Sequence, residues 1–429
     1  MTISRRTTAA AIAGATAFAF LATGCSGPAA PATGDDWKNE KITLKVATFN
    51  DFGYTDEFLA GFTKEYPNIT VEHTIAATSN DARTNYFTKL GAGSGLADVE
   101  AVEVDWLPEI MTYSDKLTDL TSDSTADRWI SWKSEAATDP DGRLIGYGTD
   151  IGPEAVCYRS DLFADAGLPT DREEVAALLE GDWQHYFDIG EDFVSKSDAA
   201  WFDSAGATYQ GMVNQITNAY EENDGTIIAA ENPAVKDIYT DVLDASEDLS
   251  AHLGQWSDDW NAGIASGKFA TMLCPGWMQG VISGQAPDTT TWDVANVFPN
   301  GGGNWGGSYL TVPAQGAHPE AATALADWLT APEQQIQAFV AAGTFPSQTA
   351  AYENADLTEF TNPYFNNAPV GKIFADRAKA VDPTPPFKGP SYFKVQDAMT
   401  QALTRVDVDE TDNADSSWDK FVTDVKAFG

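Results

Sequence analysis

Acidic, amide and indole side chains stand where predicted strands of this chain end, and such groups can hydrogen-bond and stack on a ligand. Asn50 and Asp51 follow the first predicted strand, and Asp105 and Trp106 follow the third. In an open α/β sheet, the ligand crevice lies beyond the carboxyl ends of the strands. The same residue types also form turns for local reasons, so the pattern needs support from the surrounding elements.

Two of the carboxylates could also do catalytic chemistry. Asp105 and Asp150, in a chain rich in tryptophan, could act as the acid and the nucleophile or base of a glycoside hydrolase. The glycine-rich run 91–95 is not followed by Lys-Ser or Lys-Thr, so it does not match a phosphate-binding loop. The four histidines lack metal-ligand spacing, and we predict neither a metal site nor a cofactor: His73, His185, His252 and His318.

The elements that must position these residues alternate in type. We predict strands over 42–46, 69–73 and 99–104, with helices over 55–65 and 83–90 between them. Strands that alternate with helices across short loops are typical of an α/β domain with a parallel sheet. The first part of the chain is therefore predicted to be an α/β unit.

The second part has a different pattern. Residues 161–267 are predicted to be mostly helical, and strands follow over 268–273 and 308–312. The glycine-rich segment 300–307 precedes the last of these strands, and a helix is predicted over 319–329. A chain of 429 residues is long for one compact core, so we expect two lobes.

The N-terminus resembles the leader of a bacterial lipoprotein. Arg5 and Arg6 precede a short apolar run, and small residues lead directly into Cys25. We predict a signal peptide over 1–24, a lipid on Cys25 and a flexible tether over 25–40, which would anchor an extracytoplasmic protein to the cell membrane. An ordinary signal peptide cut near Ala22 is the alternative, and the Sec and twin-arginine export routes both stay open.

Composition limits the partners. The formal net charge is −39, and hydrophobic residues make up 43% of the chain. The apolar content is ample for a folded core. A surface this acidic repels nucleic acid and anionic lipid headgroups, so we expect no nucleic-acid partner and no membrane contact besides the lipid.

Two cysteines remain besides Cys25. Cys157 and Cys274 could form a disulfide, because a site outside the cytoplasm permits oxidation. They could equally be two small buried apolar residues. Composition leaves both alternatives open.

Several stretches, in this order and spacing, carry a family resemblance. They are Phe-Thr-Lys-Glu-Tyr-Pro-Asn-Ile-Thr-Val at 62–71, Lys-Leu-Gly-Ala-Gly-Ser-Gly-Leu-Ala-Asp at 89–98, the segments 141–150 and 158–169, Gly-Lys-Phe-Ala-Thr-Met at 267–272, and Gly-Gly-Ser-Tyr-Leu-Thr-Val-Pro at 306–313. With them, the chain from about residue 41 to its end resembles the sugar-type (family 1) extracellular solute-binding proteins of ABC importers.

The resemblance implies a two-lobed α/β fold of the periplasmic-binding-protein type, with hinge crossings and a ligand cleft between the lobes. One lobe would comprise 41–153 and 274–330, and the other 154–273 and 331–429. The implied function is a non-enzymatic, monomeric lipoprotein that captures a neutral oligosaccharide and delivers it to a membrane permease. A secreted glycoside hydrolase acting on oligosaccharides is the alternative.

The resemblance also implies the residues of the site. Hydroxyls of a neutral sugar suit carboxylate and amide partners, and its C–H faces suit flat aromatic rings. The expected ligand contacts are Asn50, Asp51, Asn80, Asp105, Trp106, Asp150, Trp256, Trp277, Trp305, Gly306 and Gly307. Several tryptophan faces favour an oligosaccharide over a monosaccharide. In such proteins the strands that cross between lobes run side by side, which favours a bridge between Cys157 and Cys274.

Overall fold

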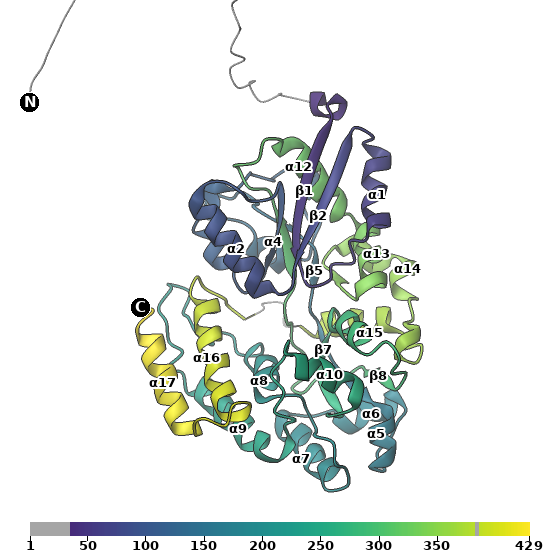
Figure 1. Cartoon of the computed structure of the whole chain (residues 1–429), viewed down its shortest axis with the longest axis vertical. Coiled ribbons are helices and arrows are strands. Elements are labelled where there is room, and N and C mark those ends of the chain that lie inside the picture. The colour runs from purple at the N-terminus through teal and green to yellow at the C-terminus, as the bar shows by residue number, and fades with distance from the viewer. Residues whose placement is uncertain (1–34, 382–385) are drawn as a thin grey trace, which may run out of the picture.

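The structure, a computed structural model, describes residues 35–381 and 386–429. The predicted leader 1–24, Cys25 and most of the predicted tether 25–40 lie outside the described residues. Figure 1 shows two lobes, one above the other in the view. Each lobe has its own sheet covered by helices, so the two-lobed α/β fold expected from the sequence is confirmed.

The first lobe is built on a five-stranded sheet with the order β2-β1-β3-β9-β4. β1 pairs in parallel with both β2 and β3, whereas β9 pairs antiparallel with β3 and β4. The predicted parallel sheet therefore includes one antiparallel strand, β9, which comes from late in the chain and lies between β3 and the edge strand β4. The strands are β1 (Ile42–Phe49), β2 (Ile69–Ala76), β3 (Val99–Glu103), β4 (Tyr147–Gly148) and β9 (Ser308–Thr311).

Helices of the first lobe form because apolar residues recur on one face. In α1 (Asp56–Glu65), Phe58, Leu59 and Phe62 are buried, and the Thr55 side chain caps the helix by accepting a hydrogen bond from the Phe58 N–H at 3.2 Å. The other helices of the first lobe are α2 (Ser79–Ala92), α3 (Leu107–Met111), α4 (Ser131–Ala136) and, from late in the chain, α12 (Pro319–Leu329).

The second lobe contains a three-stranded antiparallel sheet with the order β7-β6-β8. All residues of these strands are buried: β6 (Glu154–Arg159), β7 (Thr271–Pro275) and β8 (Trp292–Ala295). Its helices are α5 (Ser160–Asp165), α6 (Arg172–Leu179), α7 (Trp183–Val194), α8 (Ala205–Val213), α9 (Pro233–Leu249), α10 (Asp258–Ser266), α11 (Met278–Gln285), α16 (Tyr392–Asp407) and α17 (Ala414–Lys426).

The lobe boundary differs from the expected one at 274. We expected 274–330 in the first lobe, but β8 pairs with β6 and Phe298 packs in the core of the second lobe. The chain joins the first lobe only at β9. An all-buried apolar strand suits either sheet, so the sequence pattern does not say which sheet it joins.

Short segments connect the lobes. β5 (Asp150–Ile151) leads from the first lobe into β6 and pairs antiparallel with β10 (Phe345–Pro346). Near them lie α13 (Pro332–Ala342), α14 (Ala355–Thr358) and α15 (Val370–Ala380). Among the described residues, no helix combines the length and apolar character needed to cross a bilayer.

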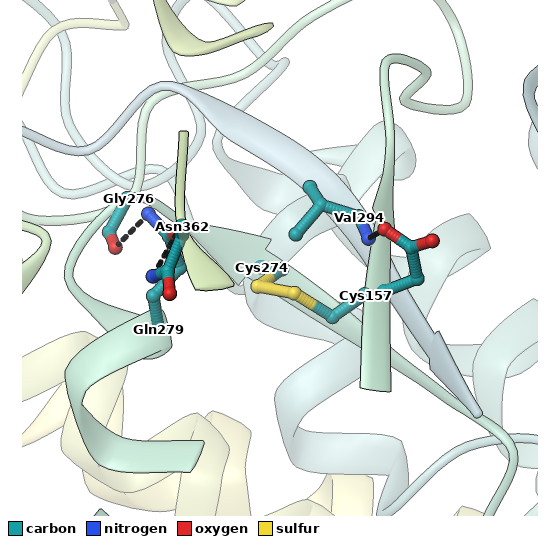
Figure 2. The surroundings of a disulfide bond; sticks show 7 residues. Cys157, Cys274, Gly276, Gln279, Val294 and Asn362 are labelled. Carbon is teal, nitrogen blue, oxygen red and sulfur yellow. Dashed lines mark hydrogen bonds between the residues drawn. A yellow bond between two sulfur atoms is a disulfide. The ribbon is translucent and has the colours of Figure 1, made fainter. Parts of the chain in front are cut away.

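Cys157 on β6 and Cys274 on β7 form a disulfide in the structure, with their Cα atoms 5.4 Å apart. Figure 2 shows the bond between the two neighbouring strands, beside Val294 of β8. Both cysteines are fully buried. The bond lies within the sheet of the second lobe, so it cross-links strands of one lobe just beyond the crossing.

Candidate ligand-binding site

A cavity of about 480 Å³ lies between the lobes. The first lobe contributes residues at the carboxyl ends of β1 and β3 and at the start of α2, and the second lobe contributes residues of α8, the 254–256 loop and α16. A cavity of this size, with both apolar and polar walls, is typical of a small-molecule site. The cavity lies beyond the strand ends, where the α/β pattern predicts it.

Ten of the eleven expected ligand contacts line this cavity. They are Asn50, Asp51, Asn80, Asp105, Asp150, Trp256, Trp277, Trp305, Gly306 and Gly307. Asn50 adopts a left-handed backbone conformation with φ 50°, which turns the chain out of β1. The exposed Asp51 side chain then accepts a hydrogen bond from the Gly53 N–H at 2.8 Å.

Trp106 is the exception and corrects the prediction. Its side chain is fully buried and packs against Tyr86 and Phe87 of α2. Its Nε1 donates a hydrogen bond to Ser79 Oγ at 3.1 Å. The indole therefore belongs to the core of the first lobe, because α2, the helix that follows β2, covers it.

Three indoles form the aromatic wall of the cavity. The rings of Trp256 and Trp277 lie nearly parallel, with centroids 6.0 Å apart and planes inclined by 21°, while Trp305 meets Trp277 edge-on. Trp277 Nε1 donates to the Trp305 carbonyl oxygen at 2.9 Å, which fixes the ring. Trp256 is 40% exposed and has a left-handed φ of 71°.

The glycine pair lets the backbone approach β5 closely. Gly306 and Gly307 have φ angles of 79° and 111°, a region that disfavours side chains. A Cβ on Gly307 would lie 2.8 Å from the Asp150 carbonyl oxygen. Asn304 ties this loop to the crossing, because its Nδ2 donates to Gly306 O and its Oδ1 accepts from Gly152 N–H.

Asp150 is buried at the edge of the cavity. Its Oδ1 accepts hydrogen bonds from the Ser308 N–H at 2.9 Å and from Thr149 Oγ1 at 2.8 Å. Burial raises the pKa of the carboxyl, and the nearby Lys133 ammonium opposes that rise only in part. Burial in turn lowers the pKa of Lys133 to about 7, despite the attraction of Asp150 and Glu103.

Asp105 pairs with a residue of the other lobe. Lys388 Nζ forms an ion pair with Asp105 Oδ1, and both side chains are largely buried. The neighbouring Phe387 N–H donates to the Thr217 carbonyl oxygen at 2.7 Å, so the lysine is held by the second lobe. Asp105 therefore lines the cavity with one oxygen already engaged.

Comparison with known proteins identifies the family. Residues 57–363 match the family described as bacterial extracellular solute-binding protein. A crystal structure described as an extracellular solute-binding protein family 1 is 47% identical, covers 90% of this chain and 99% of its own, and superposes with a TM-score of 0.79. The chain belongs to the bacterial extracellular solute-binding proteins. Such a protein works outside the cytoplasm.

More distant structures share the fold of this solute-binding protein. A binding protein from B. animalis subsp. lactis in complex with β-1,6-galactobiose is 21% identical, covers 91% of this chain and 97% of its own, and has a TM-score of 0.76. Maltose-bound MalE3 of T. maritima is 16% identical, covers 90% and 100%, and has a TM-score of 0.71. No curated protein matches the chain.

Some cavity residues of the solute-binding protein were not predicted from its sequence. Glu103 lines the cavity two residues before Asp105. On α16, Gln396, Thr400 and Thr404 form a stripe with one-turn spacing that faces the cavity. Polar residues spaced four apart can be seen in the sequence of this helix. The same spacing is equally typical of a helix face exposed to solvent, so it does not by itself predict a ligand site.

Candidate metal ligands are dispersed in the described part of the chain. Within residues 35–381 and 386–429, no three or more His, Cys, Asp or Glu side chains gather in a way that could hold a metal ion. His252 Nδ1 donates to Asp407 Oδ1 at 2.8 Å, and His73 Nε2 hydrogen-bonds with Thr48 Oγ1 at 2.7 Å. Both histidines therefore have local structural partners.

Proposed function

We propose that this solute-binding protein captures a neutral oligosaccharide between its lobes and delivers it to the membrane permease of an ABC transporter. The observation that carries the proposal is one cavity with indole rings on one wall and carboxylate and amide groups on the others. Sugars match that pairing, because their C–H faces stack on rings while their hydroxyls hydrogen-bond.

The sugar ligands of related folds support the same class. Proteins of this fold were crystallised with β-1,6-galactobiose, maltose and lacto-N-biose. The charge of the cavity favours an uncharged ligand of this kind. Asp51, Glu103, Asp105, Asp150 and Asp397 line it, and no lysine or arginine is among its described lining residues. Lys388 pairs with Asp105 and Lys133 lies near Asp150, but the five carboxylates outnumber these two lysines, so an anionic sugar would meet net like charge there.

A thermal-shift screen tests the proposal. The mature protein is mixed with maltose, β-1,6-galactobiose, lacto-N-biose, longer neutral oligosaccharides and matched uronates. A ligand that binds only the folded state raises the melting temperature. We expect a neutral oligosaccharide to give the largest rise and the uronates none. If no neutral sugar raises the melting temperature, the proposal is wrong.

The glycoside hydrolase alternative finds less support in the geometry. Asp105 is engaged by Lys388, and Asp150 accepts two hydrogen bonds from its own lobe. In each of these carboxylates one oxygen is therefore already held by a local partner. Chromatography of the best ligand after prolonged incubation distinguishes the functions, since a binding protein returns it intact and a hydrolase releases shorter sugars.

We also propose that Cys25 carries the lipid that anchors the protein to the membrane. The support is the order of charged, apolar and small residues before Cys25 in the sequence. Cells expressing the wild-type protein should retain it in the membrane fraction, and cells expressing Cys25→Ala should release it. Equal retention of both forms would contradict the anchor.

A further inference from the structure

The floor of the cavity is formed by Glu103, Gly306 and Trp277. Glu103 is the last residue of β3, and it is paired with Ser308 across the sheet. The next residue along the strand, Val104, donates its N–H to the Gly307 carbonyl oxygen at 2.9 Å. Backbone pairing with the 307–308 segment therefore fixes the backbone position of Glu103 beside the glycine pair.

The two oxygens of Glu103 have different surroundings. Oε2 accepts a hydrogen bond from the Asp105 N–H at 2.9 Å. No donor of the described residues hydrogen-bonds Oε1, which would lie 3.8 Å from a Cβ placed on Gly306. Because Gly306 has no side chain, the space in front of Oε1 stays open to the cavity.

The other acidic groups near the floor are less available. Asp105 pairs with Lys388, and Asp150 Oδ1 accepts from Ser308 and Thr149. Trp277 Nε1, which lies 3.2 Å from the same Cβ position on Gly306, is already engaged with the Trp305 carbonyl oxygen. Glu103 Oε1 is thus a polar atom on the floor that keeps its hydrogen-bonding capacity for a ligand.

We propose that Glu103 is a ligand-binding residue of this site and that its Oε1 forms a hydrogen bond with a hydroxyl of the bound sugar. This inference rests on the proposed function. A hydroxyl reaching the floor would lie beside the edge of Trp277, so one sugar ring would contact both groups at once.

The surroundings of Glu103 also make the contact sensitive to pH. Burial, followed by repulsion from Asp105, raises the pKa of Glu103 well above its usual range, and Lys388 and Lys133 oppose this only in part. The charged and titratable groups around it are Asp105 after β3, Lys133 on α4, Asp150 on β5, Tyr309 on β9, Lys388 in the loop before α16, and Tyr392 at the start of α16.

The sign of the pH effect follows from burial. A bound sugar removes water from the floor and disfavours the charged form of Glu103 further, so binding favours the protonated acid. Affinity should then fall as pH rises through the pKa of Glu103. A glutamine has the shape of the protonated acid and does not titrate, so it should preserve the contact and abolish that pH dependence.

The experiment measures sugar affinity by calorimetry at pH 5, 6, 7 and 8, with the neutral sugar that stabilises the wild type most in the screen above. Glu103→Ala should weaken binding by about tenfold or more at pH 5, the effect of losing one hydrogen bond to a buried group. Glu103→Gln should stay within about threefold of the wild type at pH 5 and show no decline toward pH 8.

Glu100→Gln is the matched control. Glu100 lies on the same strand, is buried and has a pKa raised by burial to about 7, but it does not line the cavity. Its variant should keep the wild-type affinity and pH profile, and melting curves verify that each variant is folded. Wild-type affinity and pH profile in both Glu103 variants would overturn the inference while leaving the proposed function intact. A wild type that no sugar stabilises would overturn both.

Discussion

Lys388 and Asp105 lie 283 residues apart in the chain and form an ion pair that joins the two lobes beside the cavity. The side chains are 11% and 14% exposed, so the pair is mostly shielded from water. Burial lowers the pKa of Lys388, but Asp105 together with Tyr392 and Glu103 more than compensates and holds it above its ordinary value. A second contact between the lobes lies nearby, where the Arg83 guanidinium lies 4.2 Å from the ring centroid of Phe393.

Loss of the Asp105–Lys388 pair should favour an open arrangement of the lobes. In Lys388→Gln, Asp105 would be buried without its partner, and separation of the lobes would rehydrate it. We expect a larger radius of gyration in solution scattering and about tenfold weaker sugar binding, because the closed form is less populated. Lys394→Gln, which replaces an exposed lysine of the following helix α16, is the control. An unchanged radius and affinity in Lys388→Gln would show that the pair does not stabilise closure.

Trp277→Ala should weaken sugar binding by about 1–3 kcal/mol through loss of a stacking face and its buried area. Trp277→Phe keeps an aromatic face but loses the Nε1 hydrogen bond to Trp305 O. Its affinity should therefore fall between those of the wild type and the alanine variant. Calorimetry on folded protein measures both, and a wild-type dissociation constant in Trp277→Ala would assign the ring to packing alone.

Trp256 combines an exposed ring with a left-handed backbone, which costs about 1–3 kcal/mol for a residue other than glycine. Trp256→Gly and Trp256→Ala both remove the ring, but only glycine relieves the backbone. Both variants should bind sugar more weakly, and the glycine variant should melt at the higher temperature of the two. Equal sugar affinity in the variants and the wild type would exclude Trp256 from the site.

Removal of the Cys157–Cys274 bond should lower the free energy of unfolding by about 2–4 kcal/mol, because the cross-link restricts the unfolded chain. Denaturant titration of Cys157→Ala/Cys274→Ala against the wild type measures the loss. Sugar affinity should change little, since the bond lies within one lobe. Two reactive thiols in the denatured, unreduced mature domain lacking Cys25 would show that the bond is not formed.

Stability should be greatest in mildly acidic solution. Burial raises the pKa of Glu100 to about 7, of Asp203 to about 6 and of Glu154 to about 8. Between their unfolded and folded pKa values, the native state binds more protons than the unfolded state, so stability falls as pH rises from about 5 to 8. Melting temperatures across this range should decline in the wild type and less steeply in Glu154→Gln. A flat wild-type profile would contradict the prediction.

The sequence by itself determined the α/β character, the order of the first three strands and the two helices between them, and ten of the residues that line the cavity. Periodic burial in β1 and α1 follows directly from apolar spacing, and the strand ends place Asn50, Asp51 and Asp105 at one edge of the sheet. The prediction that the tryptophans and the glycine pair of the second half contact the ligand came from the family resemblance. These features depend on local patterns that a linear chain displays.

Only the tertiary structure decided how equivalent residue types divide between core and site. Trp106 and Trp277 both follow strands. The side chain of Trp106 is covered by α2, whereas that of Trp277 lines the cavity. Lys388 reaches Asp105 from the far end of the chain, and Glu103 faces the floor because Gly306 opposite it lacks a side chain. The physical reason is that the burial, ion pairing and pKa of a side chain depend on the neighbours that packing brings next to it. Those neighbours are far away in the sequence, so a local sequence pattern does not predict them.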